Sequence, residues 1–171
     1  YSIGWFLDAV DKKWETSVEF YYKSILNVLE YKDLPQLIPN QRLETEILAG
    51  KGRAYGGEFS IRKTQGKLSG WFSYTYARSI ARVVGPSAEE TVNAGRWFPA
   101  NFDKPHQVNL ISRLQMNPTN SFTFNFTYST GRPISIPVSS YRLGNAAFAN
   151  FSERNQYRIP DYHRLDIAWT V

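Results

Sequence analysis

Apolar and polar residues alternate with a period of two over most of this chain. In Ser121–Ser129, Phe122, Phe124, Phe126 and Tyr128 occupy every second position, and Ser, Thr and Asn occupy the positions between them. Successive side chains of a β-strand point to opposite faces. The segment therefore predicts a strand with one aromatic face and one uncharged polar face.

Six other segments show the same alternation, the first of them more weakly. They are Tyr1–Ala9, Trp14–Val28, Arg53–Lys63, Lys67–Ser79, His106–Met116 and His163–Val171. Together with Ser121–Ser129 they predict seven strands and an all-β fold. Trp14–Val28 is far longer than the ~5–6 residues typical of a strand in soluble proteins. A tilted strand crosses a bilayer with ~9–11 residues.

The connections between these strands alternate between short and long. The short links are residues 10–13, 64–66 and 117–120, and they are rich in Asp, Asn, Gly and Pro, which favour tight turns. The long links are residues 32–51, 81–104 and 130–162, all approximate. This order predicts an antiparallel up-and-down sheet with the short turns at one end and the long loops at the other.

Long alternating strands with short turns at one end and long loops at the other are typical of outer-membrane β-barrels. A closed barrel pairs every backbone N–H and C=O group, as the bilayer interior requires. Aromatic residues near the strand ends are consistent with an interfacial girdle; they are Trp5, Trp14, Tyr31, Tyr55 and Trp169. We therefore expect an antiparallel up-and-down transmembrane β-barrel, with loops 32–51, 81–104 and 130–162 on the extracellular side.

A soluble β-sandwich or a lipocalin-like barrel is the alternative, because alternation alone does not tell which face points outward. Two features favour the membrane barrel. The long links exceed the 2–5 residues usual for compact hairpins. The polar faces also carry few charges in mid-strand, whereas a solvated surface is about 25–35% charged.

Composition narrows the function classes. Of the 171 residues, 42% are apolar and 16% aromatic, which argues against a disordered chain, and the absence of Cys excludes a disulfide scaffold and a Cys-based zinc site. No apolar run approaches ~18 residues, so no helical membrane span is expected. The net charge of +5 comes from scattered Lys and Arg, which argues against a nucleic-acid partner.

An odd number of strands does not fit a bacterial single-chain barrel, which has an even number from eight upward. The chain also opens without Met and ends inside a strand. We therefore expect residues 1–171 to form one partial barrel domain, with further sequence on both sides.

Five stretches, in the same order along the chain, resemble the late barrel strands of Bacteroidetes-type TonB-dependent outer-membrane receptors. They are residues 50–63, 66–79, 95–106, 128–134 and 155–166. In the third stretch Lys104 stands where this family usually has Arg before Pro-His. The resemblance covers almost the whole chain and places it in the C-terminal part of the barrel.

The resemblance implies a 22-stranded barrel in the bacterial outer membrane, closed by an N-terminal plug, that imports a scarce nutrient. Its partners would be outer-membrane lipid, the nutrient, and the TonB complex acting through the plug. The nutrient is not specified by these residues. Two other functions stay open: a passive porin, and a structural or accessory barrel subunit of a cell-envelope complex.

No enzyme motif is found in its required context, so we expect no catalytic residue and no cofactor. There is no Gly-x-Ser-x-Gly elbow and no phosphate-binding loop. Asp103 precedes His106, and Asp161 precedes His163, at two loop-to-strand junctions. Each pair offers too few ligands for a metal. We expect turn bonding and anchoring at these junctions instead.

Ligand contacts are expected from the long loops, where aromatic rings can stack on sugars or chelates and Arg can bind carboxylates or phosphates. The candidate residues are Asn93, Arg96, Trp97, Asn101, Arg132, Tyr141, Arg142 and Tyr157. The alternative is that these side chains pack loop against loop.

Overall fold

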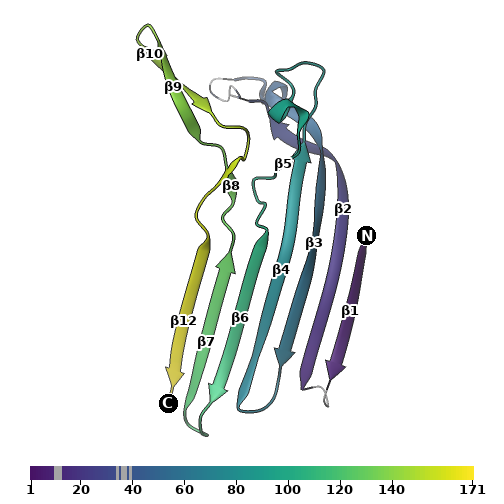
Figure 1. Ribbon diagram of the computed structural model, residues 1–171, viewed down its shortest axis with the longest axis vertical. Coiled ribbons are helices and arrows are strands. Elements are labelled where there is room, and N and C mark those ends of the chain that lie inside the picture. The colour runs from purple at the N-terminus through teal and green to yellow at the C-terminus, as the bar shows by residue number, and fades with distance from the viewer. Residues whose placement is uncertain (10–12, 34, 36–37, 39) are drawn as a thin grey trace.

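The computed structural model describes residues 1–9, 13–33, 35, 38 and 40–171. Seven long strands lie side by side in one antiparallel sheet (Figure 1). In sheet order they are β1 (Ser2–Ala9), β2 (Trp14–Tyr31), β3 (Ile47–Lys63), β4 (Leu68–Arg82), β6 (His106–Gln115), β7 (Ser121–Ser129) and β12 (Tyr162–Thr170). A two-residue strand, β5 (Phe98–Pro99), adds to the end of β4. The all-β, antiparallel, up-and-down arrangement is confirmed, and the seven predicted strands correspond to these seven.

The long strands extend further toward the loop end than the sequence pattern indicates. β2 continues to Tyr31, and β3 already begins at Ile47. On β2 a bulge causes the difference: Asn27 has φ +58°, and the register with β3 shifts between Leu26 and Val28. One extra residue breaks the period of two, so the alternation changes phase although the strand does not end.

The connection after β7 holds two small strand pairs that the sequence pattern did not predict. β8 (Pro133–Ile134) pairs with β11 (Tyr157–Arg158), and β9 (Pro137–Leu143) pairs with β10 (Ala146–Phe151). The β9–β10 hairpin extends beyond the sheet at the loop end (Figure 1). The other long connections contain short 3₁₀ turns, η1 (Leu43–Glu46) and η2 (Val92–Gly95). Of the predicted short link 10–13, residues 10–12 lie outside the described residues.

The register sorts the strand residues into an apolar face and a polar face. One row across the sheet joins Trp5, Val18, Phe59, Tyr74, Val108, Tyr128 and His163. Other rows on this apolar face contain Phe72, Leu110, Phe126 and Leu165. The intervening rows form the polar face, for example Arg62, Trp71, Ile111, Asn125 and Asp166.

Neither face of the sheet is covered by a second layer of the described chain (Figure 1). On the apolar face Trp5 is 66% exposed and Ile167 is 59% exposed. The buried cluster in the described residues is instead small and lies at the loop end, where Ala81, Val83, Val92 and Phe98 pack together. The described helices are two four-residue turns, so they offer no span for a membrane.

Candidate functional site

The three long connections meet at one end of the sheet, where charged side chains join them. Asp103, just before β6, is at the centre of one group, with a fully buried side chain. Its Oδ1 accepts the backbone N–H of Ser79 at 2.7 Å and Nε–H of Arg78 at 3.3 Å. Arg158 forms an ion pair with Oδ2 of the same carboxylate.

Arg158 links the second and third long connections. Its Nη1 donates to the backbone oxygen of Asp103 at 2.7 Å and to that of Gly131 at 2.9 Å. Two guanidinium groups therefore compensate one buried carboxylate. An unpaired buried charge would be costly, which makes each member of this group dependent on the others.

Arg154 links the third connection to the end of β2 and the residues that follow it. Its Nη1 donates to Oε2 of Glu30 at 3.0 Å and to the backbone oxygen of Tyr31 at 2.8 Å. Its Nη2 donates to the backbone oxygen of Lys32 at 3.0 Å and to Oδ1 of Asp33 at 2.7 Å. Both terminal nitrogens of the guanidinium thus join segments more than 120 residues apart in sequence.

Two of the predicted ligand residues use their amides for loop packing. Asn93 Nδ2 donates to the backbone oxygen of Arg154 at 3.1 Å, and Asn93 Oδ1 accepts the backbone N–H of Arg154 at 2.8 Å. Asn101 Oδ1 accepts from Asn155 Nδ2 at 2.8 Å. Asn155 Nδ2 also donates to the backbone oxygen of Pro99 at 2.7 Å.

Arg96 and Asn93 line a cleft of about 570 Å³ between the connections. Arg96 forms an ion pair with Glu153 across this cleft, and Asp33 and Arg154 complete its charged lining. Trp97 lies elsewhere: its ring stacks against the guanidinium of Arg53, 4.4 Å from the ring centroid. Arg53 belongs to the apolar face of β3, so Trp97 faces that side of the sheet.

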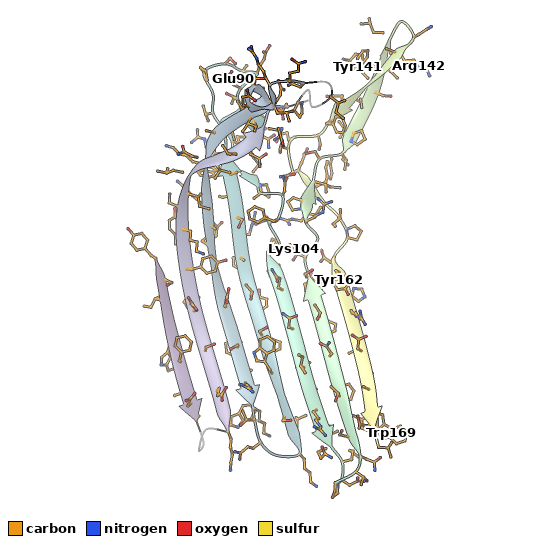
Figure 2. All side chains as sticks on the ribbon, turned by 180° about the vertical axis from the view of Figure 1, so that it is seen from behind. Glu90, Lys104, Tyr141, Arg142, Tyr162 and Trp169 are labelled. Carbon is orange, nitrogen blue, oxygen red and sulfur yellow. The ribbon has the colours of Figure 1, made fainter. Side chains whose placement is uncertain are left out.

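The remaining candidates lie apart from this cleft. Tyr141 and Arg142 are on the projecting β9–β10 hairpin, well away from Glu90 on the second connection (Figure 2). The ring of Tyr141 stacks on Phe148 with a centroid distance of 5.5 Å. Tyr157 and Arg132 are exposed, in and beside the short β8–β11 strand pair. The structure therefore brings together Asn93 and Arg96 but not the eight candidates as one site.

The two Asp–His junctions act as anchors, as the sequence predicts. Asp161 Oδ1 accepts the N–H of Gly131 at 2.9 Å, the counterpart of the bond between Asp103 and Ser79. Asp161 Oδ2 accepts the hydroxyl of Tyr128 at 2.5 Å. These two hydrogen bonds hold the pKa of the Asp161 carboxyl below its usual range. Among the described residues, no three His, Asp or Glu side chains converge as metal ligands.

The residues that organise the loop end, Arg154, Arg158 and Glu153, were not among the sequence candidates. Their charged partners are 55 to 124 residues away, as for Asp103 and Glu30. No local pattern marks such pairs. Comparisons of the chain with protein-family models, with curated proteins and with solved structures found no match.

Proposed function

We propose that this chain forms part of the transmembrane β-barrel of a bacterial outer-membrane TonB-dependent receptor that imports a nutrient. The apolar face carries the proposal. Seven strands present aromatic and aliphatic side chains on one side, and the described chain places no protein layer over them. In water such a face would be strongly unfavourable, whereas lipid is the solvent in which it is stable.

Along single strands, the length of the apolar stretch matches the thickness of a bilayer. On β2 the apolar face runs from Trp14 to Tyr22, and on β4 it runs from Leu68 to Tyr76, nine residues in each strand. A tilted strand needs ~9–11 residues to cross. Trp14 and Tyr22 at the two ends on β2, and Tyr76 at one end on β4, fit an interfacial girdle.

Charge is distributed as a membrane barrel requires. Between those ends the apolar face carries no Asp, Glu, Lys or Arg in the seven strands. The polar face carries Glu19, Glu58, Arg62, Arg113 and Asp166. In the proposed barrel this face lines a wet lumen.

The receptor assignment within this proposal rests on the resemblance of the five stretches. The long connections are joined by ion pairs and form a cleft beside Arg96, which supports a role of this end in binding a solute. A passive porin and a structural subunit of an envelope complex share the same barrel and are the competing functions. In all three, the edge strands β1 and β12 would need further strands as partners.

The orientation of the sheet is tested with two tryptophans in adjacent rows. Trp14 is on the apolar face and 36% exposed, and Trp71 is on the polar face and 39% exposed. Variants that retain only one of the two, with Phe at the other Trp positions, are placed in vesicles containing acyl-chain-brominated lipid. Bromine should quench Trp14 strongly and Trp71 weakly. Equal quenching, or protein that stays monomeric in water without detergent, would contradict the proposal.

The transport mechanism needs a separate test. Growth on the candidate nutrient is measured in cells with and without a working TonB complex, using the full-length protein. An importer loses uptake when the energy source is removed. Uptake that persists, together with swelling of protein-loaded liposomes in small sugars, would favour the porin, and the absence of both would favour the structural subunit.

A further inference from the structure

We propose that Lys51 and Arg82 bind the phosphate of a membrane lipid in a hollow on the apolar face of the sheet. This inference rests on the proposed function, because it takes the apolar face to lie against lipid. The ligand is a lipid whose headgroup carries phosphate. Its acyl chains would lie along the apolar face of the strands, away from the loop end.

The first observation is a pair of like charges with no counter-charge. Lys51 on β3 and Arg82 on β4 are directly opposite each other in the register and share the apolar face. Like charges in this arrangement destabilise a sheet. Within the described residues, no carboxylate lies within ion-pairing distance of either side chain. An anion between them would turn this repulsion into attraction.

The second observation is the shape and lining of the surface around the pair. A hollow of about 450 Å³ is bordered by Lys51 and Arg82 together with the apolar Leu26, Ala49 and Val84. Leu26 and Val84 are both more than half exposed. The hollow therefore combines two cationic side chains with an apolar lining, which suits an amphipathic ligand better than a free ion.

The third observation is depth. Along β3, the apolar stretch ends at Tyr55. Lys51 is four residues closer to the loop end, or ~13 Å along the strand. The polar headgroup region begins at the edge of the hydrocarbon core. Arg53 lies between Tyr55 and Lys51 on the same face and is held against Trp97. A tilt of ~35–45° reduces this distance to ~10 Å in depth. The long side chains of Lys51 and Arg82 can extend back from there to the level of the lipid phosphates.

The contacts of Arg82 fix the direction of its guanidinium. Its Nε donates to the backbone oxygen of Gly95 at 2.6 Å. In the described part of the chain, no hydrogen bond is recorded for its two terminal nitrogens. Arg presents such nitrogens as a fork that matches two oxygens of a phosphate, and Lys adds a point charge. Arg82 and Lys51 together can therefore bind one phosphate.

The test uses the purified protein in a neutral maltoside detergent, titrated with phosphatidylglycerol and analysed by native mass spectrometry. Diacylglycerol with the same chains and inorganic phosphate serve as separate probes. The variant is Lys51→Gln/Arg82→Gln. The control is Lys23→Gln/Arg113→Gln, which removes one Lys and one Arg from the polar face.

We expect one tightly bound phosphatidylglycerol, weakened about tenfold or more in the first variant and unchanged in the control. Lys51→Arg, which keeps the charge, should bind as the wild type does. Diacylglycerol and inorganic phosphate should not compete at equal concentration. Equal loss in the control, unchanged binding in the variant, or full competition by inorganic phosphate would overturn the lipid site.

The two proposals fail in different ways. If Trp14 is quenched by brominated lipid and Trp71 is not, but phosphatidylglycerol binding ignores Lys51 and Arg82, only the lipid site is wrong. If Trp14 and Trp71 are quenched alike, the membrane orientation itself is wrong, and the lipid site is wrong with it.

Discussion

Asp103 illustrates how a single residue holds the loop end together. Its carboxylate is completely buried, yet it neutralises Arg78 and Arg158 and also accepts the N–H of Ser79. The sequence indicates an anchoring role from its place before β6. Its two Arg partners come from β4 and β11, so only the folded chain identifies them.

Asp103→Asn should destabilise the protein substantially, because it leaves two guanidinium groups without their anion. Removal of one partner of a buried pair costs ~3–5 kcal/mol. Arg78 and Arg158 are 29% and 27% exposed, so water recovers part of this loss. We expect a loss of about 2–3 kcal/mol in the free energy of unfolding by urea in vesicles. Asp166→Asn, which breaks a half-exposed pair with Arg164, is the control and should cost under about 1 kcal/mol.

Asp161 should make the loop end sensitive to acid. Its pKa is lowered in the folded protein, first by the Tyr128 hydroxyl and then by the Gly131 N–H. A lowered folded pKa means that the ionised carboxylate stabilises the fold above its unfolded pKa of about 4. This stability is lost as the pH falls through the folded pKa.

The urea midpoints of the wild type and of Asp161→Asn should differ at neutral pH and converge on acidification below about pH 4. Tyr128→Phe removes the hydroxyl and should reduce the acid sensitivity of the wild-type carboxylate. A midpoint difference that is independent of pH would contradict the assignment.

At the scale of the strands, the two faces make opposite demands on neighbouring residues. Leu110 is on the apolar face, directly opposite Phe72 and Phe126, and Asn109 is next to it on the polar face. Arg on the lipid side of a barrel costs ~2–4 kcal/mol near the bilayer midplane. Leu110→Arg should therefore lower the free energy of unfolding by about that amount. Asn109→Arg, at the same depth, should cost less than about half as much. Similar losses for both would argue against lipid contact.

The same strands show how far sequence alone predicts this fold. The period of two locates all seven because each strand has one apolar face and one polar face, and its own residues alternate accordingly. The prediction stops at Val28 on β2 because the bulge at Asn27 changes the phase of the pattern. The β9–β10 hairpin was missed for another reason. Its strands read PVSSYRL and AAFANF, and neither sequence alternates apolar and polar residues with a period of two.

For the molecule as a whole, the sheet and its loop end are organised by different forces. The sheet is held by continuous backbone pairing, and in the proposed barrel its apolar face lies against lipid. The loop end is held by a few arginines that bring distant segments together, above all Arg154 with Glu30 and Asp33. Such pairs leave no periodic trace, and the candidate site could for that reason be predicted only as a set of loops. The cleft beside Arg96 exists only while these segments stay joined.

Arg154→Ala should loosen the third long connection while the sheet stays intact. The variant loses four donor contacts, to Glu30, Tyr31, Lys32 and Asp33. Hydrogen bonds to charged groups contribute ~1.5–3 kcal/mol each when fully formed. Loss of only one such bond would raise the equilibrium constant for opening of the connection about tenfold or more.

Chymotrypsin measures this opening, because it cleaves after the aromatic residues of the connection and does not depend on Arg. Cleavage of native protein follows the population of open forms when opening is fast. We expect about a tenfold faster cut within residues 130–161 for Arg154→Ala, with the strands protected. Arg142→Ala, on the exposed β9–β10 hairpin, should cleave as the wild type does. Arg154→Lys should fall between the two, since Lys keeps the charge and loses the fork. Equal rates for Arg154→Ala and Arg142→Ala would show that the loop end is held by its apolar cluster rather than by Arg154.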